Sequence, residues 1–422
     1  METNFNQSSN TGRGWAIFWV GCPVFVMSMF LRVSTTVISP DLTKDLNLTS
    51  AQLGLLSSVF FYAFALCQLP LGMALDRFGS RIVVTILNGL GVAGALLLAL
   101  AQTAAQCIWA RVLMGIGMSC NLMGILPLIA AWFPATRFAS LNGLMAGIGV
   151  LGSLLAATPL AFLAQAIGWR KSFLLFAVIN ALLALCFFLI VQDRPSIQQA
   201  SNPTTGNPLK GMMTVLSLPV YWVISIGAFF RYGCLMALQG LWAGPYLMNG
   251  LGKDILTTGN ALLIMGVGYM IGLPLFGRIS DLLIRSRKKL IIPSLWIMAL
   301  LILILVFLPK GINVVWIYLW FLAFGLASAP GQIMYSHIKE LVPSQVMSTA
   351  MTGINLFTML GAAFLMQAMG LMVETWPQGL SHPEAFRPAW YLCVSGLGLS
   401  GAIYMLIPDS PVFKKSQASG PH

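Results

Sequence analysis

Long apolar stretches separated by short polar segments run along the whole chain. Each stretch holds about twenty residues or more, the length that an α-helix needs to cross a hydrocarbon core roughly 30 Å thick. Six stretches lie at 15–38, 51–75, 82–103, 105–133, 140–164 and 172–192. Six more lie at 219–242, 258–277, 290–308, 314–336, 347–373 and 389–407. The pattern predicts an all-α membrane protein with about twelve transmembrane helices.

The two sets of six are divided by a polar segment at 193–216. This segment is rich in Ser, Thr, Gln, Asn and Pro, a composition that is typical of loops. We therefore predict an N-terminal six-helix bundle at 1–192, a cytoplasmic linker at the polar segment, and a C-terminal six-helix bundle at 217–422.

A short internal repeat indicates that the two bundles are related. The segment from Gly72 to Asp76 follows the second apolar stretch, and a similar segment from Gly277 to Asp281 follows the eighth. Further along, Pro134 and Gly152 have the same spacing as Pro343 and Gly361. Parallel repeats of six helices occur in transporters whose halves move about a site near the bilayer midplane. We expect two pseudo-symmetric bundles.

The composition indicates that most of the chain is surrounded by lipid. Of the 422 residues, 58% are hydrophobic and 8% are charged, against roughly 45–50% and 25% in soluble proteins. The net charge of +12 comes from basic residues scattered between apolar stretches, which leaves no soluble domain to form a nucleic-acid-binding face. The seven cysteines show no metal-ligand spacing. We expect no nucleic-acid partner, no metal and no cofactor.

The positions of lysine and arginine predict the orientation in the membrane. With the N-terminus inside, most basic residues fall in cytoplasmic segments. The outer segments hold Lys44, Arg170, Lys171, Lys253, Lys310 and Arg387. The positive-inside rule then places both termini in the cytoplasm, with the chain in a bacterial inner membrane. The first apolar stretch is too long for a signal-peptide core, so we expect it to remain as a helix.

A loop motif follows the second apolar stretch: Gly72-Met73-Ala74-Leu75-Asp76-Arg77-Phe78-Gly79-Ser80-Arg81. It resembles the loop signature of the major facilitator superfamily, G-x-x-x-D-R-x-G-x-R. The resemblance implies that family's fold and a latch in which Asp76 and Arg77 hold the cytoplasmic ends of the two halves together in the outward-facing state. Gly72, which would allow close approach of two helices, belongs to this latch. The other expected members are Gly79, Arg81, Gly277 and Asp281. A plainer interpretation is that Arg77 and Arg81 only set the topology.

Other segments resemble the same superfamily, and the resemblance covers nearly the whole chain. They are Arg111-Val-Leu-Met-Gly115-Ile-Gly117, Trp132-Phe133-Pro134 and Gly168-Trp169-Arg170. The fifth stretch contains several glycines, which are expected to serve close helix packing. It lacks the paired Gly-Pro that is typical of drug/proton antiporters, and this difference counts against drug efflux.

The charged residues inside the apolar stretches are all arginines: Arg32, Arg111 and Arg231. The acidic residues fall in tails, loops or the ends of stretches. An arginine at the centre of a span costs roughly 2.5–3.5 kcal/mol on insertion scales, so such residues usually face a cavity, form a pair or bind a substrate. Because no carboxylate is expected at mid-depth, a negatively charged substrate is the partner that we predict.

Arg32 and Arg231 lie on corresponding helices, the first of each half. A guanidinium presents its donors as a fork that suits the paired oxygens of a carboxylate or phosphate. The arrangement resembles the organophosphate and organic-anion permeases of the superfamily, in which an arginine from each half faces the central cavity. We predict that Arg32 and Arg231 together bind one anion, with Arg111 as a further candidate. Alternatively, Arg32 extends to the outer surface and bonds to helix carbonyls.

Polar and aromatic residues on the expected cavity-lining helices are candidates to complete the substrate site. They are Tyr62, Asn121, Tyr232, Gln239, Gln332, Tyr335 and Asn355. For each of them the alternative is a hydrogen bond between two helices. His337, near the inner end of the tenth stretch, is either a proton site at neutral pH or an interfacial histidine.

These features predict a secondary transporter that moves a small anionic metabolite, an organic acid or a phosphate ester, by rocker-switch alternating access. Coupling is expected to be proton symport or anion exchange. Uptake of an amino acid or nucleoside is an alternative. Multidrug efflux is weaker, since it predicts a buried carboxylate. A membrane sensor would need an output domain and an enzyme would need a nucleophile, metal or cofactor motif, so we expect neither. The chain is expected to be a monomer.

Overall fold

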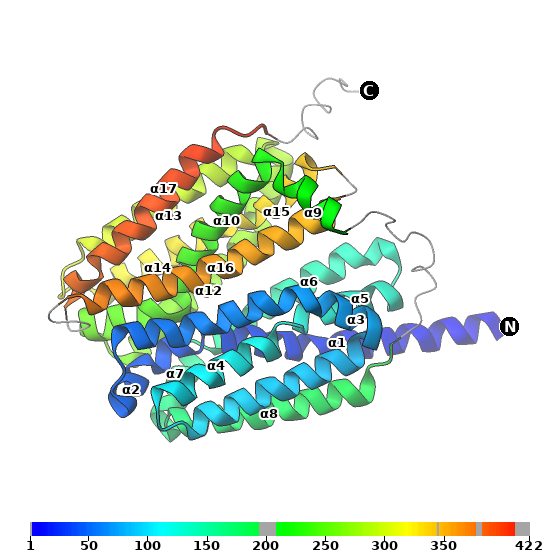
Figure 1. Cartoon of the computed structure of the whole chain (residues 1–422), viewed down its shortest axis with the longest axis horizontal. Coiled ribbons are helices and arrows are strands. Elements are labelled where there is room, and N and C mark those ends of the chain that lie inside the picture. Colours follow the sequence, from blue (N-terminus) through cyan, green and yellow to red (C-terminus); the bar gives the residue numbers. More distant parts are fainter. Residues whose placement is uncertain (1, 194–207, 344–345, 377–381, 410–422) are drawn as a thin grey trace. The chain divides into compact units, whose positions relative to one another are not determined.

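All regular secondary structure in the described part of the chain is helical (Figure 1). The computed structural model describes residues 2–193, 208–343, 346–376 and 382–409. Within these residues, the predicted all-α fold is confirmed. Contacts divide the chain into two compact units. The N-terminal unit comprises Met1–Leu48 and Leu55–Pro203, and the C-terminal unit comprises Thr49–Gly54 and Thr204–His422.

The described part of the N-terminal unit consists of eight helical elements. They are α1 (Glu2–Val33), α2 (Thr35–Leu46), α3 (Ser50–Leu100), α4 (Ala104–Met118), α5 (Asn121–Trp132), α6 (Ala135–Leu155), α7 (Thr158–Ile167) and α8 (Trp169–Ile190). α3 is two helices joined across a kink at Gly79, where φ is 76°. The first predicted span is broken at Ser34, between α1 and α2. The first turn of α3 belongs to the C-terminal unit, in which the backbone N–H of Ala51 donates to Glu374 Oε2 at 2.6 Å.

The C-terminal unit contains more irregular helix. Its elements are α9 (Pro208–Leu216), α10 (Pro219–Ala237), η1 (Leu238–Trp242), α11 (Ala243–Pro245), η2 (Tyr246–Gly250), α12 (Ile255–Arg278), η3 (Ile279–Ile284), α13 (Lys288–Val306), α14 (Val314–Ser328), η4 (Ala329–Gln332), α15 (Ile333–Leu341), α16 (Met347–Glu374), η7 (Pro383–Phe386) and α17 (Arg387–Tyr404). η1, η2 and η3 are π-helical, and η4 is a 3₁₀ turn that interrupts the tenth predicted span. π-helical segments inside longer helices occur frequently at functional sites.

Eleven segments of the described chain are long and apolar enough to cross a membrane, and they coincide with the first eleven predicted stretches. The twelfth stretch forms α17, which is helical but not among the eleven. A Cβ at Gly396 would overlap the ring of Phe230 on α10, and one at Gly401 would overlap the indole of Trp296 on α13. α17 therefore packs through close contact with neighbouring helices.

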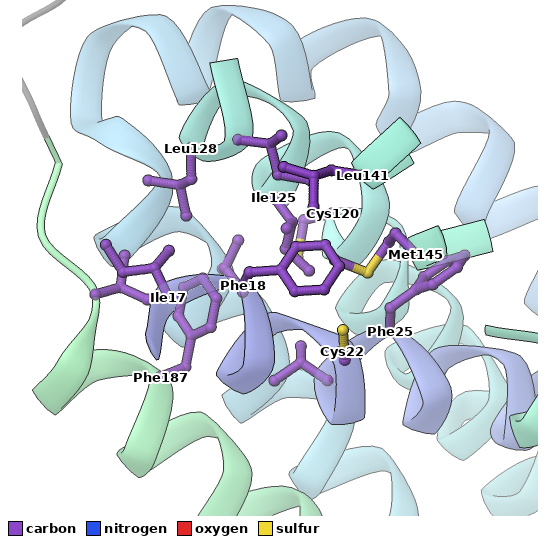
Figure 2. Packing of buried hydrophobic residues seen from close by; sticks show 14 of the residues in the cluster. Ile17, Phe18, Cys22, Phe25, Cys120, Ile125, Leu128, Leu141, Met145 and Phe187 are labelled. Carbon is purple, nitrogen blue, oxygen red and sulfur yellow. The ribbon is translucent and has the colours of Figure 1, made fainter. Parts of the chain in front are cut away.

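The N-terminal unit has an apolar core between α1 and the helices beside it. Figure 2 shows this cluster of buried residues, in which rings and aliphatic chains interdigitate. The labelled members are Ile17, Phe18, Cys22, Phe25, Cys120, Ile125, Leu128, Leu141, Met145 and Phe187. They come from α1, α5, α6 and α8 and from Cys120 just before α5. α1 packs mainly against α6, α8 and α5.

The two glycines that the internal repeat aligns make the same contact in each unit. A Cβ at Gly152 of α6 would overlap the carbonyl oxygen of Val26 on α1. A Cβ at Gly361 of α16 would overlap the carbonyl oxygen of Phe229 on α10. In both units the fifth span thus crosses the first span at a glycine, where the backbones can approach closely. The contact gives a structural reason for the repeat in the sequence.

We predict that Gly152→Ala lowers the thermal stability of the purified protein, because its methyl group requires a backbone shift that typically costs about 1–3 kcal/mol. Gly143→Ala is the matched control. Gly143 lies in the same helix, and a Cβ added there would have no atom within 4 Å, so the substitution should not lower stability. Thermal unfolding in detergent checks both, and equal melting temperatures for the two variants would contradict the close contact.

Candidate functional site

Arg231 is the centre of the polar site in the C-terminal unit. Its side chain is 1% exposed, and its Nη1 donates to the carbonyl oxygen of Ser328 at 3.1 Å. Its Nε is buried and has no hydrogen-bond partner among the described residues. A Cβ at Gly331 would overlap Arg231 Cδ. The absence of a side chain at Gly331 is what lets the guanidinium lie against this turn.

The break between α14 and α15 positions this contact. Pro330 lies in η4 and has no backbone N–H, so it cannot make the hydrogen bond of a continuous helix. The turn tightens to 3₁₀ geometry at Pro330 and Gly331. The Ser328 carbonyl accepts a hydrogen bond from the side chain of Arg231. Irregular backbone at membrane depth is tolerated where protein or a cavity satisfies it.

Polar and aromatic groups surround Arg231. Its Cζ lies 5.7 Å from the centre of the Tyr232 ring. Tyr335 lies one helical turn after Gly331, near the start of α15. Tyr335 donates to Asn355 Oδ1 at 3.4 Å. The structure thus brings Arg231, Tyr232, Tyr335 and Asn355, which were predicted from distant parts of the sequence, into one region of the C-terminal unit.

Tyr269 on α12 belongs to this region, and the sequence analysis missed it. Gln332, a predicted site residue, donates from Nε2 to the Tyr269 hydroxyl at 2.9 Å. The sequence carries no signal for Tyr269, because a tyrosine in an apolar stretch does not show which face of the helix it occupies. Gln239 is buried farther along the span in η1. Its substrate role stays a prediction.

Two buried arginines of the N-terminal unit lie on aromatic rings of α3. The rings of Phe60 and Phe64 are stacked with centroids 6.4 Å apart. Arg111 Cζ lies 4.6 Å from the Phe60 centroid, and Arg32 Cζ lies 4.9 Å from the Phe64 centroid. A cation over an aromatic face is attracted by the ring quadrupole. Arg32 is only 6% exposed, so it does not extend to the surface as the alternative interpretation held.

Arg111 makes one hydrogen bond in the described structure. Its Nη1 donates to the carbonyl oxygen of Leu31 at 2.8 Å, while Nε and Nη2 are buried without a hydrogen-bond partner among the described residues. Neither Arg111 nor Arg231 contacts a described carboxylate. The ion pairs Asp45–Arg170, Arg287–Glu340 and Arg387–Glu384 lie at helix ends instead. That Arg32 and Arg231 grip a single anion stays a prediction.

Tyr62 and Asn121 are placed differently from each other. Tyr62 is half-buried on α3, two residues after Phe60 and two before Phe64 in the sequence. Asn121 is fully buried; its Nδ2 donates to the Val24 carbonyl at 3.1 Å, and its Oδ1 accepts from Asn88 at 2.7 Å. These contacts join α5 to α1 and α3, which is the interhelical bonding named as the alternative for this residue.

The loop motif binds a carboxylate within its own unit. The backbone N–H groups of Ser80 and Arg81 donate to Asp193 at 2.9 and 3.2 Å. A Cβ at Gly79 would overlap the Asp193 carboxylate, so both the positive φ and the space require glycine. Arg81 donates from Nε to the Phe188 carbonyl at 2.7 Å. Asp193 therefore caps the helix that starts after the kink, a role that the sequence analysis did not foresee.

The C-terminal unit repeats this arrangement. Asp409, which follows its last span, accepts from the backbone N–H groups of Arg287 and Lys288 at 3.1 and 3.2 Å and from the Ser286 hydroxyl. Arg285 before it has a φ of 48°. In each unit, an aspartate after the sixth span thus caps the third span.

The other latch residues give less support. No atom lies within 4 Å of a Cβ at Gly72 or Gly277, so the close helix contact expected of Gly72 is not found. Arg77 is exposed, with Cζ 5.3 Å from the centre of the Phe78 ring. The side chains of Asp76 and Asp281 lie outside the described ones. A latch between the halves stays a prediction.

Further hydrogen bonds and an ion pair join helices at the opposite end of the N-terminal unit. Asp45 at the end of α2 accepts from Trp169 Nε1 at 2.9 Å and pairs with Arg170. The hydrogen bond from the Trp169 indole lowers the pKa of Asp45 more than burial raises it, and Arg170 lowers it further. Arg170 also donates to the Ala101 carbonyl at 3.0 Å. The Gly168-Trp169-Arg170 segment therefore fixes the start of α8.

We predict that Asp193→Ala lowers thermal stability by about 0.5–2 kcal/mol, the usual effect of removing a helix-capping side chain. The amides of Ser80 and Arg81 lose their acceptor in this variant. Gln192→Ala, an exposed neighbour, is the control and should melt with the wild type. Thermal unfolding in detergent measures both variants. Equal melting temperatures would show that the Asp193 cap does not stabilise the protein.

The sequence matches the family described as the Major Facilitator Superfamily over residues 21–244 and again over residues 224–422. The chain belongs to the major facilitator superfamily, a family of membrane transporters. The resemblance predicted from the loop motif is confirmed.

Three curated relatives are bacterial transporters. The uncharacterized transporter YybO of Bacillus subtilis is 27% identical over 58% of this chain, which spans 60% of that protein. The hexuronate transporter of Bacillus subtilis is 24% identical over 66% of this chain and 69% of its own length. The probable galactarate/D-glucarate transporter GudP of Escherichia coli is 22% identical over 87% of this chain and 89% of its own length.

A solved structure agrees with the fold. The D-xylose-proton symporter matches 93% of this chain and 98% of its own, with a TM-score of 0.76 and 16% sequence identity. At this identity, the likeness concerns the fold alone.

Proposed function

We propose that this protein transports a small sugar acid, of the hexuronate or aldarate kind, across the bacterial inner membrane by alternating access. The observation that carries the proposal is the burial of Arg231 beside polar groups with no described carboxylate to neutralise it. A buried guanidinium without an anion is costly, because the charge loses its hydration and gains no opposite charge in return. A carboxylate of the substrate supplies that charge.

The groups around Arg231 suit the rest of a sugar acid. A guanidinium binds a carboxylate through two parallel N–H donors, and the Nε of Arg231 is still without a partner in the described structure. Tyr335, Gln332 and Asn355 offer hydroxyl and amide groups, each able to donate and accept hydrogen bonds with the hydroxyls of a sugar chain. The hexuronate and galactarate/D-glucarate transporters among the relatives move molecules of this chemistry, by their names.

The N-terminal unit contributes a second basic region to the proposal. Arg32 and Arg111 hold positive charge beside Phe60 and Phe64, where few water molecules can screen it. Arg231 and this second region are both positively charged, so both attract anions. Both units therefore favour anionic cargo over cationic cargo.

The orientation and oligomeric state belong to the same proposal. The excess of basic residues in the alternate loops favours cytoplasmic termini. The protein works as a monomer, with each unit providing half of the transport machinery.

We predict that Arg231→Ala weakens binding of D-glucarate and D-galacturonate by roughly 30-fold or more, because removing one partner of a buried charge contact costs about 2–5 kcal/mol. Arg231→Lys should restore little of the affinity, since it keeps the charge and loses the fork. Calorimetric titration of purified protein in detergent measures the affinities. Arg137→Ala, at an exposed position, is the control and should bind as the wild type does. Unchanged affinity in Arg231→Ala would remove this residue from the site.

A further inference from the structure

The end of the C-terminal unit that the sequence places in the cytoplasm holds a buried polar network, whereas the matching place in the N-terminal unit is apolar. His337 lies as far before Pro343 as Leu128 lies before Pro134. Leu128 packs in the apolar cluster of Figure 2. His337 is equally buried, at 0% exposure. The N-terminal unit places an apolar side chain at this position, whereas the C-terminal unit places an imidazole there.

Both ring nitrogens of His337 are hydrogen-bonded, and their partners fix the tautomer. Nε2 lies 3.2 Å from the carbonyl oxygen of Pro408, and Nδ1 lies 2.8 Å from the hydroxyl of Tyr404. A carbonyl can only accept, so Nε2 carries the hydrogen in the neutral ring. Nδ1 then accepts from Tyr404. Nδ1 is the atom to which a further proton adds, after which the Tyr404 hydroxyl turns to accept from it.

Charged groups of both signs surround the imidazole. Glu340 lies one turn farther along α15 and is held by Arg287 of the adjoining segment, through contacts of 2.9 and 3.2 Å. Arg287 also donates to the Ser280 hydroxyl at 2.9 Å. Asp409 directly follows Pro408. The Pro408 carbonyl lies 3.2 Å from Nε2 of His337, so Asp409 lies beside this network.

Lys288 belongs to the same end of the unit, and its Nζ donates to the Ile407 carbonyl at 2.8 Å. Two carboxylates, one guanidinium and one ammonium thus face this network. The two carboxylates can offset a positive charge added at the ring.

One short helix links His337 to the substrate region. α15 contains nine residues and begins directly after the 3₁₀ turn whose Gly331 supports Arg231. Tyr335 and His337 are two residues apart on this helix. His337 hydrogen-bonds α15 to Tyr404 and Pro408. A change in these hydrogen bonds therefore shifts the helix that contains Tyr335 and follows Gln332.

We propose that His337 is the proton-binding site that couples transport to a proton gradient, so that the protein is a proton symporter. The proposal rests on the proposed function, because it assigns a driving ion to that same substrate site. Histidine is the side chain that ordinarily titrates between about pH 5 and 8. The acidic residues of the sequence lie outside the middle of the spans, so the imidazole takes the place of a membrane-buried carboxylate.

The test uses the purified full chain in proteoliposomes with radiolabelled D-glucarate and D-galacturonate. One assay measures accumulation driven by an inward proton gradient, and the other measures exchange of labelled for unlabelled acid at uniform pH. His337→Gln keeps a donor and an acceptor in the buried site but does not bind a proton at neutral pH. It should lower gradient-driven accumulation at least about tenfold while leaving exchange within about twofold of the wild type.

His382→Gln is the matched control, because His382 lies before η7 and outside the network. It should behave as the wild type in both assays. The proposal is overturned if the wild type exchanges but does not accumulate under the gradient, if His337→Gln still accumulates, or if His337→Gln loses exchange as well, which marks a structural role. If the wild type exchanges neither acid, the proposed function fails, and the proton site fails with it.

Discussion

Positive charge that is buried without a negative partner among the described residues is the constraint that shapes this protein. Arg231 donates to the Ser328 carbonyl and lies against Gly331, and Arg111 donates to the Leu31 carbonyl above the Phe60 ring. Carbonyl dipoles and ring faces offset part of the cost of burying a guanidinium, but they leave its net charge in place. An anion from outside the chain can supply the missing charge, and this is the basis of the selectivity for acids over neutral sugars that we propose.

The two units meet this constraint with the same helices in opposite roles. In the N-terminal unit, the arginine is on the fourth span and its acceptor is on the first. In the C-terminal unit, the arginine is on the first span, α10, and its acceptor precedes the break in the fourth. The first and fourth spans of each repeat are thus tied by an arginine near a helix interruption. Discontinuous helices of this kind form the substrate sites of many secondary transporters.

The sequence predicted the arrangement of spans well because length and apolar composition are decided locally by the bilayer. It also revealed Gly152 and Gly361, whose equal contacts explain their repetition. The caps formed by Asp193 and Asp409 were not predicted, because each depends on a loop conformation with positive φ and on a partner far away in the sequence. Tyr269 was missed for a similar reason: a tyrosine on an apolar helix gives no sign of which face it occupies. Asn121, a predicted site residue, is hydrogen-bonded to Asn88 and to the Val24 carbonyl, and its substrate role stays a prediction.

The central claim is that charge recognition, rather than hydroxyl recognition, determines what this protein binds. Calorimetric titration of the wild-type protein with acids and their uncharged counterparts tests it most directly, using D-glucarate against D-glucitol and D-galacturonate against D-galactose. The account predicts that at least one acid binds and that its neutral counterpart shows no binding at the same concentrations. Equal affinity for an acid and its neutral counterpart would contradict it.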